Sequence, residues 1–234
     1  MPDTRAPRRL GARAVLFDLD GTLADTAGDL ADAVNAVRRD RGLPPVPVEA
    51  VRTHASSGAR GMLGAGMGVT PEHPDYPALR DAFLAHYAIG LARTTRLFDG
   101  VDALLTALDG RAIRWGVVTN KAERFTRPVA EALGLASRTA VIVSGDTTPH
   151  AKPHPAPLLY AAAQLGVDAM HCVYVGDDLR DVQAGNAAGM ATLVAMYGYI
   201  GGTTDPATWP ATGWVAQPRD VLAWLPDGRA KAPG

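Results

Sequence analysis

One short segment, residues 15–23, limits the fold more than any other, because an apolar run leads directly into Asp-Leu-Asp-Gly-Thr. Residues 14–17 are all apolar, which is typical of a buried strand. Because side chains alternate along a strand, Asp18 and Asp20 lean to the same side beyond its carboxyl end. Two close carboxylates stay ionised together only when a cation joins them, and an oxygen-ligated ion such as Mg²⁺ suits them. The segment predicts a cation site at a strand end, or else a solvated turn without function.

The composition excludes several classes of function. The 234 residues suffice for one large domain, or for a domain with an insertion. Lys and Arg total 23 against 24 Asp and Glu, so no charge excess points to nucleic acid or to an acidic membrane. No apolar run approaches the roughly 18 residues that a transmembrane helix needs. The single cysteine, Cys172, allows no internal disulfide and favours the cytoplasm as the location.

Both ends of the chain are predicted to be disordered tails. Residues 1–9 hold three arginines and two prolines, and the apolar segment of a secretory signal does not follow them. Residues 228–234 are interpreted in the same way. We therefore expect the folded part to begin near residue 10 and to end near residue 227.

The hydrophobic periodicity divides the chain into two kinds of region. Between residues 24 and 95 only helical patterns occur, at about 26–41, from about 48 onward through the glycine-rich stretch 56–61, and at about 78–93. From residue 98 onward helices and apolar strands alternate, and the strands are expected at 113–119, 140–144, 172–175 and 191–196. Alternation of this kind predicts an α/β fold with a doubly wound parallel sheet, into which an all-helical segment is inserted.

Polar residues follow almost every one of these strands. In such sheets ligands bind at the carboxyl ends of the strands, so these residues are expected to meet at one edge. They are Asp18 and Asp20 after the first strand, Thr119, Asn120 and Lys121 after the second, Asp177, Asp178 and Asp181 after Gly176, and Lys152 ahead of a helix. Chance could place polar residues at one strand end, but their placement at nearly all of them predicts an active site.

These residues resemble the four motifs of the haloacid dehalogenase-like phosphohydrolases. The matching stretches are Asp18-Leu19-Asp20-Gly21-Thr22, Thr119, Lys152 and Gly176-Asp177-x-x-x-Asp181, and the resemblance covers nearly the whole chain. It implies a catalytic core at 10–23 and 96–227 and a helical cap domain at 24–95. Within the family the chain looks most like bacterial phosphoglycolate phosphatases, on residues 118–121 and 175–181. It is also similar to N-acetylmuramic acid 6-phosphate phosphatases, on residues 97–100, 115–121 and 197–200.

The resemblance implies a role for each motif residue. Asp18 would be the nucleophile that forms an aspartyl-phosphate, and Asp20 would be the general acid and then the base. Thr119 would hold a phosphoryl oxygen, and Lys152 would offset the negative charge between Asp18 and the phosphoryl group. Mg²⁺ would be bound by Asp18, the backbone carbonyl of Asp20 and Asp177. Asp178 and Asp181 would hold metal-bound water or Lys152. Gly21, Thr22, Asn120 and Lys121 are candidate contacts to the substrate.

Each residue also has a structural explanation. Thr119 could cap the following helix, Lys152 could be a solvated loop lysine, and Asp178 and Asp181 suit a helix start through the helix dipole. Arg60, in the glycine-rich stretch, is the cationic candidate to meet a substrate carboxylate, and a surface position is its alternative. Taken together, order and spacing favour catalysis over these separate explanations.

The expected activity is Mg²⁺-dependent hydrolysis of a small phosphate ester, with 2-phosphoglycolate as the first candidate substrate. N-acetylmuramic acid 6-phosphate is the alternative, and a sugar phosphomutase on the same fold also uses both aspartates. Because Asp20 is present, a dehalogenase is set aside. A non-catalytic binding module is the rival of another class, although no chemical residue is missing. Partners other than the substrate are not expected, and the chain could be a monomer or a homodimer.

Overall fold

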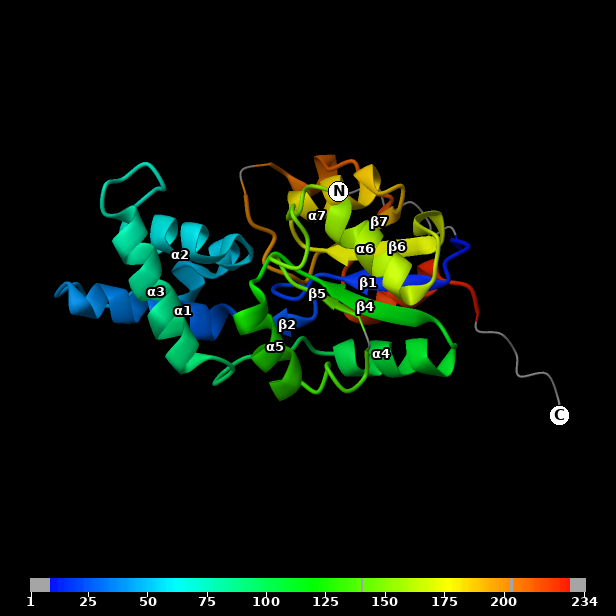
Figure 1. Cartoon of the computed structure of the whole chain (residues 1–234), viewed down its shortest axis with the longest axis horizontal. Helices are drawn as coiled ribbons and strands as arrows, with labels where there is room; N and C mark the ends of the chain where they lie inside the picture. Colours follow the sequence, from blue (N-terminus) through cyan, green and yellow to red (C-terminus); the bar gives the residue numbers. More distant parts are fainter. Residues whose placement is uncertain (1–8, 140, 203, 228–234) are drawn as a thin grey trace.

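A six-stranded parallel sheet forms the centre of the larger part of the protein (Figure 1). The computed structural model describes residues 9–139, 141–202 and 204–227. The strand order is β5-β4-β1-β6-β7-β8. The bounds are β1 Ala14–Phe17, β4 Arg114–Val118, β5 Ile142–Val143, β6 Cys172–Gly176, β7 Ala191–Ala195 and β8 Gly213–Val215. The strand that leads into Asp18 therefore lies inside the sheet, paired with β4 and β6 on either side.

Helices cover both faces of this sheet, which confirms the predicted doubly wound fold. On one face α4 (Val101–Gly110), α5 (Glu123–Ala132) and a 3₁₀ segment, Pro218–Trp224, pack around Val15 and Phe17 of β1. On the other face α6 (Ala156–Leu165) and α7 (Leu179–Ala187) pack around Leu16. Successive β1 side chains thus enter opposite cores, which explains why the whole strand is apolar.

A separate helical lobe lies beside the sheet, at the left of Figure 1. It consists of α1 (Ala27–Asp40), two 3₁₀ segments (Val48–Ala50 and Arg52–Ser57), α2 (Gly58–Met67) and α3 (Tyr76–Gly90). Leu30 and Val34 of α1, Leu63 of α2 and Phe83 of α3 belong to a core of its own. Two short antiparallel strands, β2 (Ala24–Asp25) and β3 (Arg96–Leu97), connect this lobe to the sheet domain.

Several details differ from the sequence-based expectations. The strands β2, β3 and β8 were not predicted, because two or three residues carry no readable periodicity. The helix expected from residue 48 begins only at Gly58, after 3₁₀ turns. The strand expected at 140–144 spans 142–143, and residue 140 lies outside the described residues.

The predicted tails lie outside the described residues except for Arg9, which pairs with Asp227. Within the described part of the chain, none of the helices combines the length and the apolar character needed to span a bilayer.

Candidate active site

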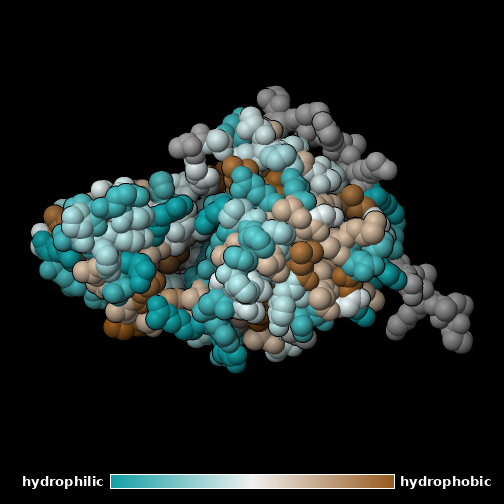
Figure 2. Space-filling view, turned by 45° about the horizontal axis from the view of Figure 1, so that its top comes forward, coloured by the Kyte–Doolittle hydropathy of each residue, from teal (hydrophilic) through white to brown (hydrophobic). Residues whose placement is uncertain are grey.

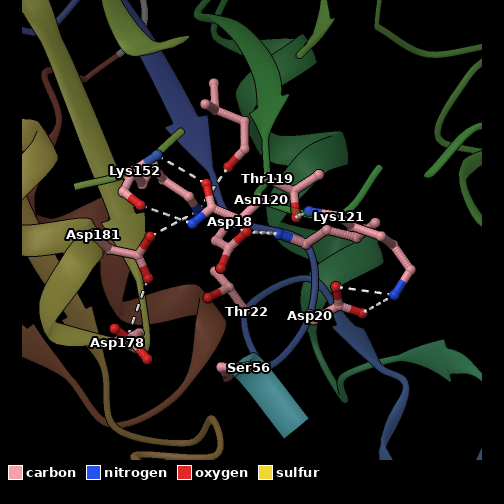
Figure 3. Close-up of polar contacts among 12 residues, drawn as sticks. Asp18, Asp20, Thr22, Ser56, Thr119, Asn120, Lys121, Lys152, Asp178 and Asp181 are labelled. Carbon is pink, nitrogen blue, oxygen red and sulfur yellow. Dashed lines mark hydrogen bonds and ion pairs between the residues drawn. The ribbon is translucent and has the colours of Figure 1, made fainter. Parts of the chain in front are cut away.

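The carboxyl ends of β1, β4 and β6 bring the predicted residues to one edge of the sheet (Figure 3). Asp18 and Asp20 follow β1, Thr119 follows β4, and Asp177 follows β6. A cavity of about 330 Å³ lies over this edge and is also lined by residues of α1, α3 and the segment 55–59 of the lobe. Figure 2 shows that the surface is hollowed between the lobe and the sheet domain. The arrangement provides a pocket with buried carboxylates at its base.

Lys152 is the central cation of this base. Its Nζ lies 2.9 Å from Asp18 Oδ1 and 2.8 Å from Asp181 Oδ1, and the side chain is almost completely buried. Nζ also donates hydrogen bonds to the Tyr174 hydroxyl and to the Val118 carbonyl. Burial alone would lower the pKa of Lys152, but the charges of Asp18 and Asp181 outweigh this effect and raise it. Lys152 is thus held as an ammonium, and it is not a solvated loop lysine.

Asn120 positions the loop that carries Lys152. Its side-chain amide donates to the Lys152 carbonyl and its Oδ1 accepts from the Lys152 N–H, each at 2.9 Å. The residue was predicted to contact substrate, and the structure gives its side chain this positioning contact. The adjacent Thr119 is buried, and its hydroxyl accepts a hydrogen bond from the Lys121 N–H. A threonine hydroxyl can also donate, so Thr119 keeps a donor for a ligand.

Three buried carboxylates leave the base of the pocket with more negative than positive charge. One oxygen each of Asp18, Asp177 and Asp181 lies within 4.8 Å of the others. Burial raises the pKa of Asp18 to about 7, and the charges of Asp181 and Asp20 act in the same direction. Burial, with Asp18 and Asp181 nearby, also raises the pKa of Asp177 well above its usual range. Among the described residues Asp177 has no cationic partner, so a divalent cation fits this donor set.

Asp177 is held by hydrogen bonds from three different parts of the chain. Thr22 Oγ1 donates to Oδ1 at 2.9 Å, while Ser56 Oγ and the Tyr199 N–H donate to Oδ2 at 2.8 and 3.2 Å. Gly21 has a φ of +85°, and a Cβ there would lie 2.2 Å from Asp177 Oδ2. The turn after Asp20 therefore requires glycine at position 21 for two reasons: the backbone φ is positive, and Asp177 lies too close to leave room for a Cβ.

Asp20 turns away from this group and pairs with Lys121 (Figure 3). Lys121 Nζ lies 2.9 and 3.1 Å from its two carboxylate oxygens, and Thr26 Oγ1 donates to Oδ1 at 2.6 Å. Burial alone would lower the pKa of Lys121, but the charge of Asp20 outweighs burial and raises it. The two aspartates of the motif therefore have different environments, which allows them different chemical roles.

Asp178 and Asp181 open helix α7 and point to different partners. Asp178 caps the helix by accepting from the Arg180 N–H, and Asp181 Oδ2 accepts from the Asp178 N–H in return. The remaining oxygen of Asp181 is the one that meets Lys152. Burial opposes ionisation of Asp178, but hydrogen bonds and charge from Arg180 outweigh it and lower its pKa. Both residues therefore lie at the start of the helix, where the dipole was expected to favour them, and this position coexists with the contact of Asp181 to Lys152.

The structure does not bring Arg60 into the cavity, contrary to the sequence-based hypothesis. The adjacent residues 58 and 59 line the pocket, but Arg60 is exposed. The next position on a helix points about 100° further round, so Arg60 turns out toward solvent. The sequence placed a cation in the right segment of the lobe but could not give its direction.

Among the residues that line the cavity, sequence reasoning missed the polar side chains of Ser56, Tyr87, Arg124 and Arg180. Arg180 binds Asp178 and also donates to the Ser56 carbonyl at 2.9 Å, so it bridges the sheet domain and the lobe. Tyr87 was counted only as an apolar position of its helix. A tyrosine on an otherwise apolar face was the available signal, because its hydroxyl needs a partner or a ligand.

Comparisons with known proteins agree with this geometry. A family profile described as haloacid dehalogenase-like hydrolase matches residues 15–195. The chain is 43% identical over 215 residues to an N-acetylmuramic acid 6-phosphate phosphatase of Pseudomonas aeruginosa, covering 92% of this chain and 95% of that protein. It is 44% identical over 218 residues to a phosphoglycolate phosphatase of Xanthomonas campestris pv. campestris, covering 92% and 96%.

A solved structure shows a similar fold. It is described as a predicted phosphoglycolate phosphatase from Haemophilus somnus, and it superposes with a TM-score of 0.79 at 26% identity, covering 91% of this chain and 97% of that one. The match therefore includes the helical lobe as well as the sheet domain. Profile, relatives and fold agree with one another. The chain therefore belongs to the haloacid dehalogenase-like hydrolase family and is one of its phosphatases.

Proposed function

We propose that this enzyme hydrolyses phosphate monoesters of hydroxy acids in a Mg²⁺-dependent reaction that passes through an aspartyl-phosphate on Asp18. The observation that carries the proposal is the contact of 2.9 Å between Asp18 and Lys152 at the base of the cavity. A carboxylate held beside a buried ammonium, next to a second carboxylate that lacks a cation, is suited to attack an anionic phosphoryl group. We further propose that residues 24–95 act as a cap over this site, and that the enzyme works in the cytoplasm.

The first step joins Asp18 to the substrate. A carboxylate oxygen of Asp18 forms a bond to phosphorus while the bond from phosphorus to the alcohol oxygen breaks. Lys152 offsets charge on the oxygens of the phosphoryl group, and the Thr119 hydroxyl donates to one of them. Asp20 gives its proton to the departing alcohol oxygen, so a neutral alcohol leaves.

Asp20 and water complete the cycle. Asp20, now a carboxylate, takes a proton from a water molecule whose oxygen attacks phosphorus, and the bond to Asp18 breaks to release phosphate. The ion pair with Lys121 and the hydrogen bond from Thr26 hold the Asp20 side chain in place for this second step.

We propose that Asp18, Asp177 and the backbone carbonyl of Asp20 hold the magnesium ion. When bound, the ion supplies positive charge that lowers repulsion between the carboxylates and the phosphoryl oxygens. Asp181 is already engaged by Lys152 and by the Asp178 N–H, so its role is to hold Lys152. Asp178 holds Arg180 in the same way, and Thr22 holds Asp177.

Removal of metal should silence the enzyme without unfolding it. Chelation by EDTA is expected to abolish phosphate release, and Mg²⁺ should restore it, whereas Ca²⁺ should restore little because its coordination is looser and larger. Mg²⁺ should also raise the melting temperature of wild type, because the ion binds the folded state alone. Asp177→Asn should lose this thermal shift as well as the activity.

The matched control is Asp81→Asn, which changes an exposed carboxylate on α3. It should keep the Mg²⁺ shift and the Mg²⁺ requirement of wild type. Full turnover in excess EDTA, or an unchanged Mg²⁺ shift in Asp177→Asn, would contradict the proposed metal site.

The substrate class can be tested by phosphate release from purified enzyme. We expect turnover of p-nitrophenyl phosphate and a higher kcat/KM for a physiological hydroxy-acid phosphate. The two candidates from the relatives are 2-phosphoglycolate and N-acetylmuramic acid 6-phosphate. Release of free phosphate without a bisphosphate activator separates a phosphatase from a phosphomutase. Absence of turnover with all three esters would leave only a binding function and would overturn the proposal.

A further inference from the structure

An apolar wall forms part of the lining of the cavity. It is formed by Leu30, Phe83, Leu84, Tyr87 and Phe125. The rings of Phe83 and Tyr87 lie 6.3 Å apart, and Tyr87 packs at 5.3 Å against Phe125 of the sheet domain. Apolar and aromatic side chains line pockets that hold carbon skeletons, whereas a phosphate group gains nothing from them. The wall therefore belongs to the part of the site that receives the alcohol of the substrate.

The hydroxyl of Tyr87 is a polar group without a partner in this wall. The residue is 2% exposed, and within the described residues its oxygen forms no hydrogen bond. A buried hydroxyl without a partner destabilises the fold, so most such groups are satisfied by protein, water or ligand. Because Tyr87 lines the cavity, a ligand in the cavity can supply the missing bond.

Lys121 lies between Tyr87 and Asp20, the proposed proton donor. Its Nζ lies 4.7 Å from the centre of the Tyr87 ring and 2.9 Å from an oxygen of Asp20. In the proposed function Asp20 protonates the departing alcohol, and this inference rests on that proposal. The alcohol must then leave beside Asp20, which places it next to Lys121 and Tyr87.

Arg124 is the cation of the cavity that is not already paired within the described part of the chain. Lys121, Lys152 and Arg180 each form an ion pair with an aspartate of the site. Arg124 lines the cavity from α5, and its guanidinium lies 4.6 Å from the centre of the Phe125 ring, at the end of the apolar wall. A guanidinium in this position suits a carboxylate, which it can bind with two parallel hydrogen bonds.

We infer that Tyr87 and Arg124 determine specificity, and that they select the phosphate ester of a sugar-sized alcohol that carries a carboxylate. The sugar-sized skeleton lies against the wall, the Tyr87 hydroxyl bonds one of its polar groups, and Arg124 binds the carboxylate. A two-carbon acid would leave most of the wall and of the 330 Å³ cavity unfilled. The inference places 2-phosphoglycolate second to a carboxylated sugar phosphate.

The test measures kcat/KM for four esters in wild type, Arg124→Ala and Tyr87→Phe. The esters are N-acetylmuramic acid 6-phosphate, N-acetylglucosamine 6-phosphate without the carboxylate, 2-phosphoglycolate and p-nitrophenyl phosphate. Wild type should prefer the first. Arg124→Ala should lower kcat/KM for N-acetylmuramic acid 6-phosphate by about 10-fold or more, as expected for a hydrogen bond to a charged group. It should lower kcat/KM for N-acetylglucosamine 6-phosphate only slightly. Arg124→Lys should recover part of the loss.

Tyr87→Phe should lower kcat/KM about 5-fold on both sugar phosphates, as expected for one neutral hydrogen bond, and by a smaller factor on p-nitrophenyl phosphate. Two variants outside the cavity lining are matched controls and should behave as wild type. Arg127→Ala lies on α5, like Arg124, and Tyr76→Phe lies on α3, like Tyr87. Equal losses on all four esters, or a wild-type preference for 2-phosphoglycolate, would overturn the inference. Absence of turnover on every ester would instead contradict the proposed function.

Discussion

Asp18→Asn is expected to reduce phosphatase turnover by at least about a thousand-fold, because an amide cannot form the aspartyl-phosphate. The fold should persist. Folding raises the pKa of Asp18 from 3.8 to about 7, so its contribution to stability is present below pH 3.8 and is lost as the pH rises to 7. At pH 8 and without metal, the neutral asparagine should therefore melt no lower than wild type. Phosphate release with Mg²⁺ and thermal melting followed by circular dichroism measure both effects.

The control for this variant keeps the charge change but moves it away from the site. Asp81→Asn removes an exposed carboxylate and should retain wild-type turnover. A folded Asp18→Asn enzyme with near wild-type kcat would assign the nucleophile to another residue. Loss of activity together with loss of the circular dichroism signal would mean that Asp18 is needed for folding, and the same substitution would then not support a covalent role.

The sequence predicted the base of the site well because each contributing residue follows a strand. In a parallel sheet the strand ends meet at one edge, so Asp18, Thr119 and Asp177 could be placed together without knowledge of the packing. The apolar run 14–17 was also decisive, since both faces of β1 are covered and every side chain is buried. Local patterns and the rule for strand ends were sufficient for this part of the protein.

The contacts made by the helical lobe could not be predicted in the same way. Ser56 lies in a 3₁₀ turn, and its contact with Asp177 joins residues 121 positions apart in the chain. The orientation of Arg60 depends on where α2 begins, and the glycine-rich stretch gave no clear start. Tyr87 has the same apolar spacing as Leu79 and Phe83, so periodicity placed it in the core of the lobe. That Tyr87 also lines the cavity depends on how the lobe packs against the sheet domain, which periodicity does not reveal.

The charge balance of the site depends on Lys152 more than on any other residue. It is the one described cation within salt-bridge distance of Asp18 and Asp181, and the same ammonium donates to two neutral oxygens. Four oxygens therefore lose a donor when it is removed. Asp177, close to the same group, is held within the described residues only by hydrogen bonds from neutral donors. Without Lys152 the buried carboxylates would face one another with no positive charge between them.

Lys152→Met should therefore lower both activity and stability. We expect kcat/KM to fall by at least about a thousand-fold, because the charge that stabilises the transferring phosphoryl group is lost. We expect the free energy of unfolding to fall by about 3–5 kcal/mol at pH 8, as when one partner of a buried ion pair is removed. Denaturant unfolding without metal measures this difference, and methionine keeps the length of the side chain.

The pH dependence distinguishes lost charge from lost packing. Lys152 lowers the pKa of Asp18 in wild type, so in the variant Asp18 should hold its proton in the folded state to higher pH than it does in wild type. In wild type the contribution of Asp18 to stability is lost as the pH rises to about 7, whereas in the variant the loss continues to higher pH, so the deficit relative to wild type should grow between pH 7 and pH 9. Lys152→Arg retains the charge and should lose less stability at pH 8 than methionine does. A methionine deficit that is the same at both pH values would mean that Lys152 stabilises the fold by packing, and the electrostatic account of this site would be wrong.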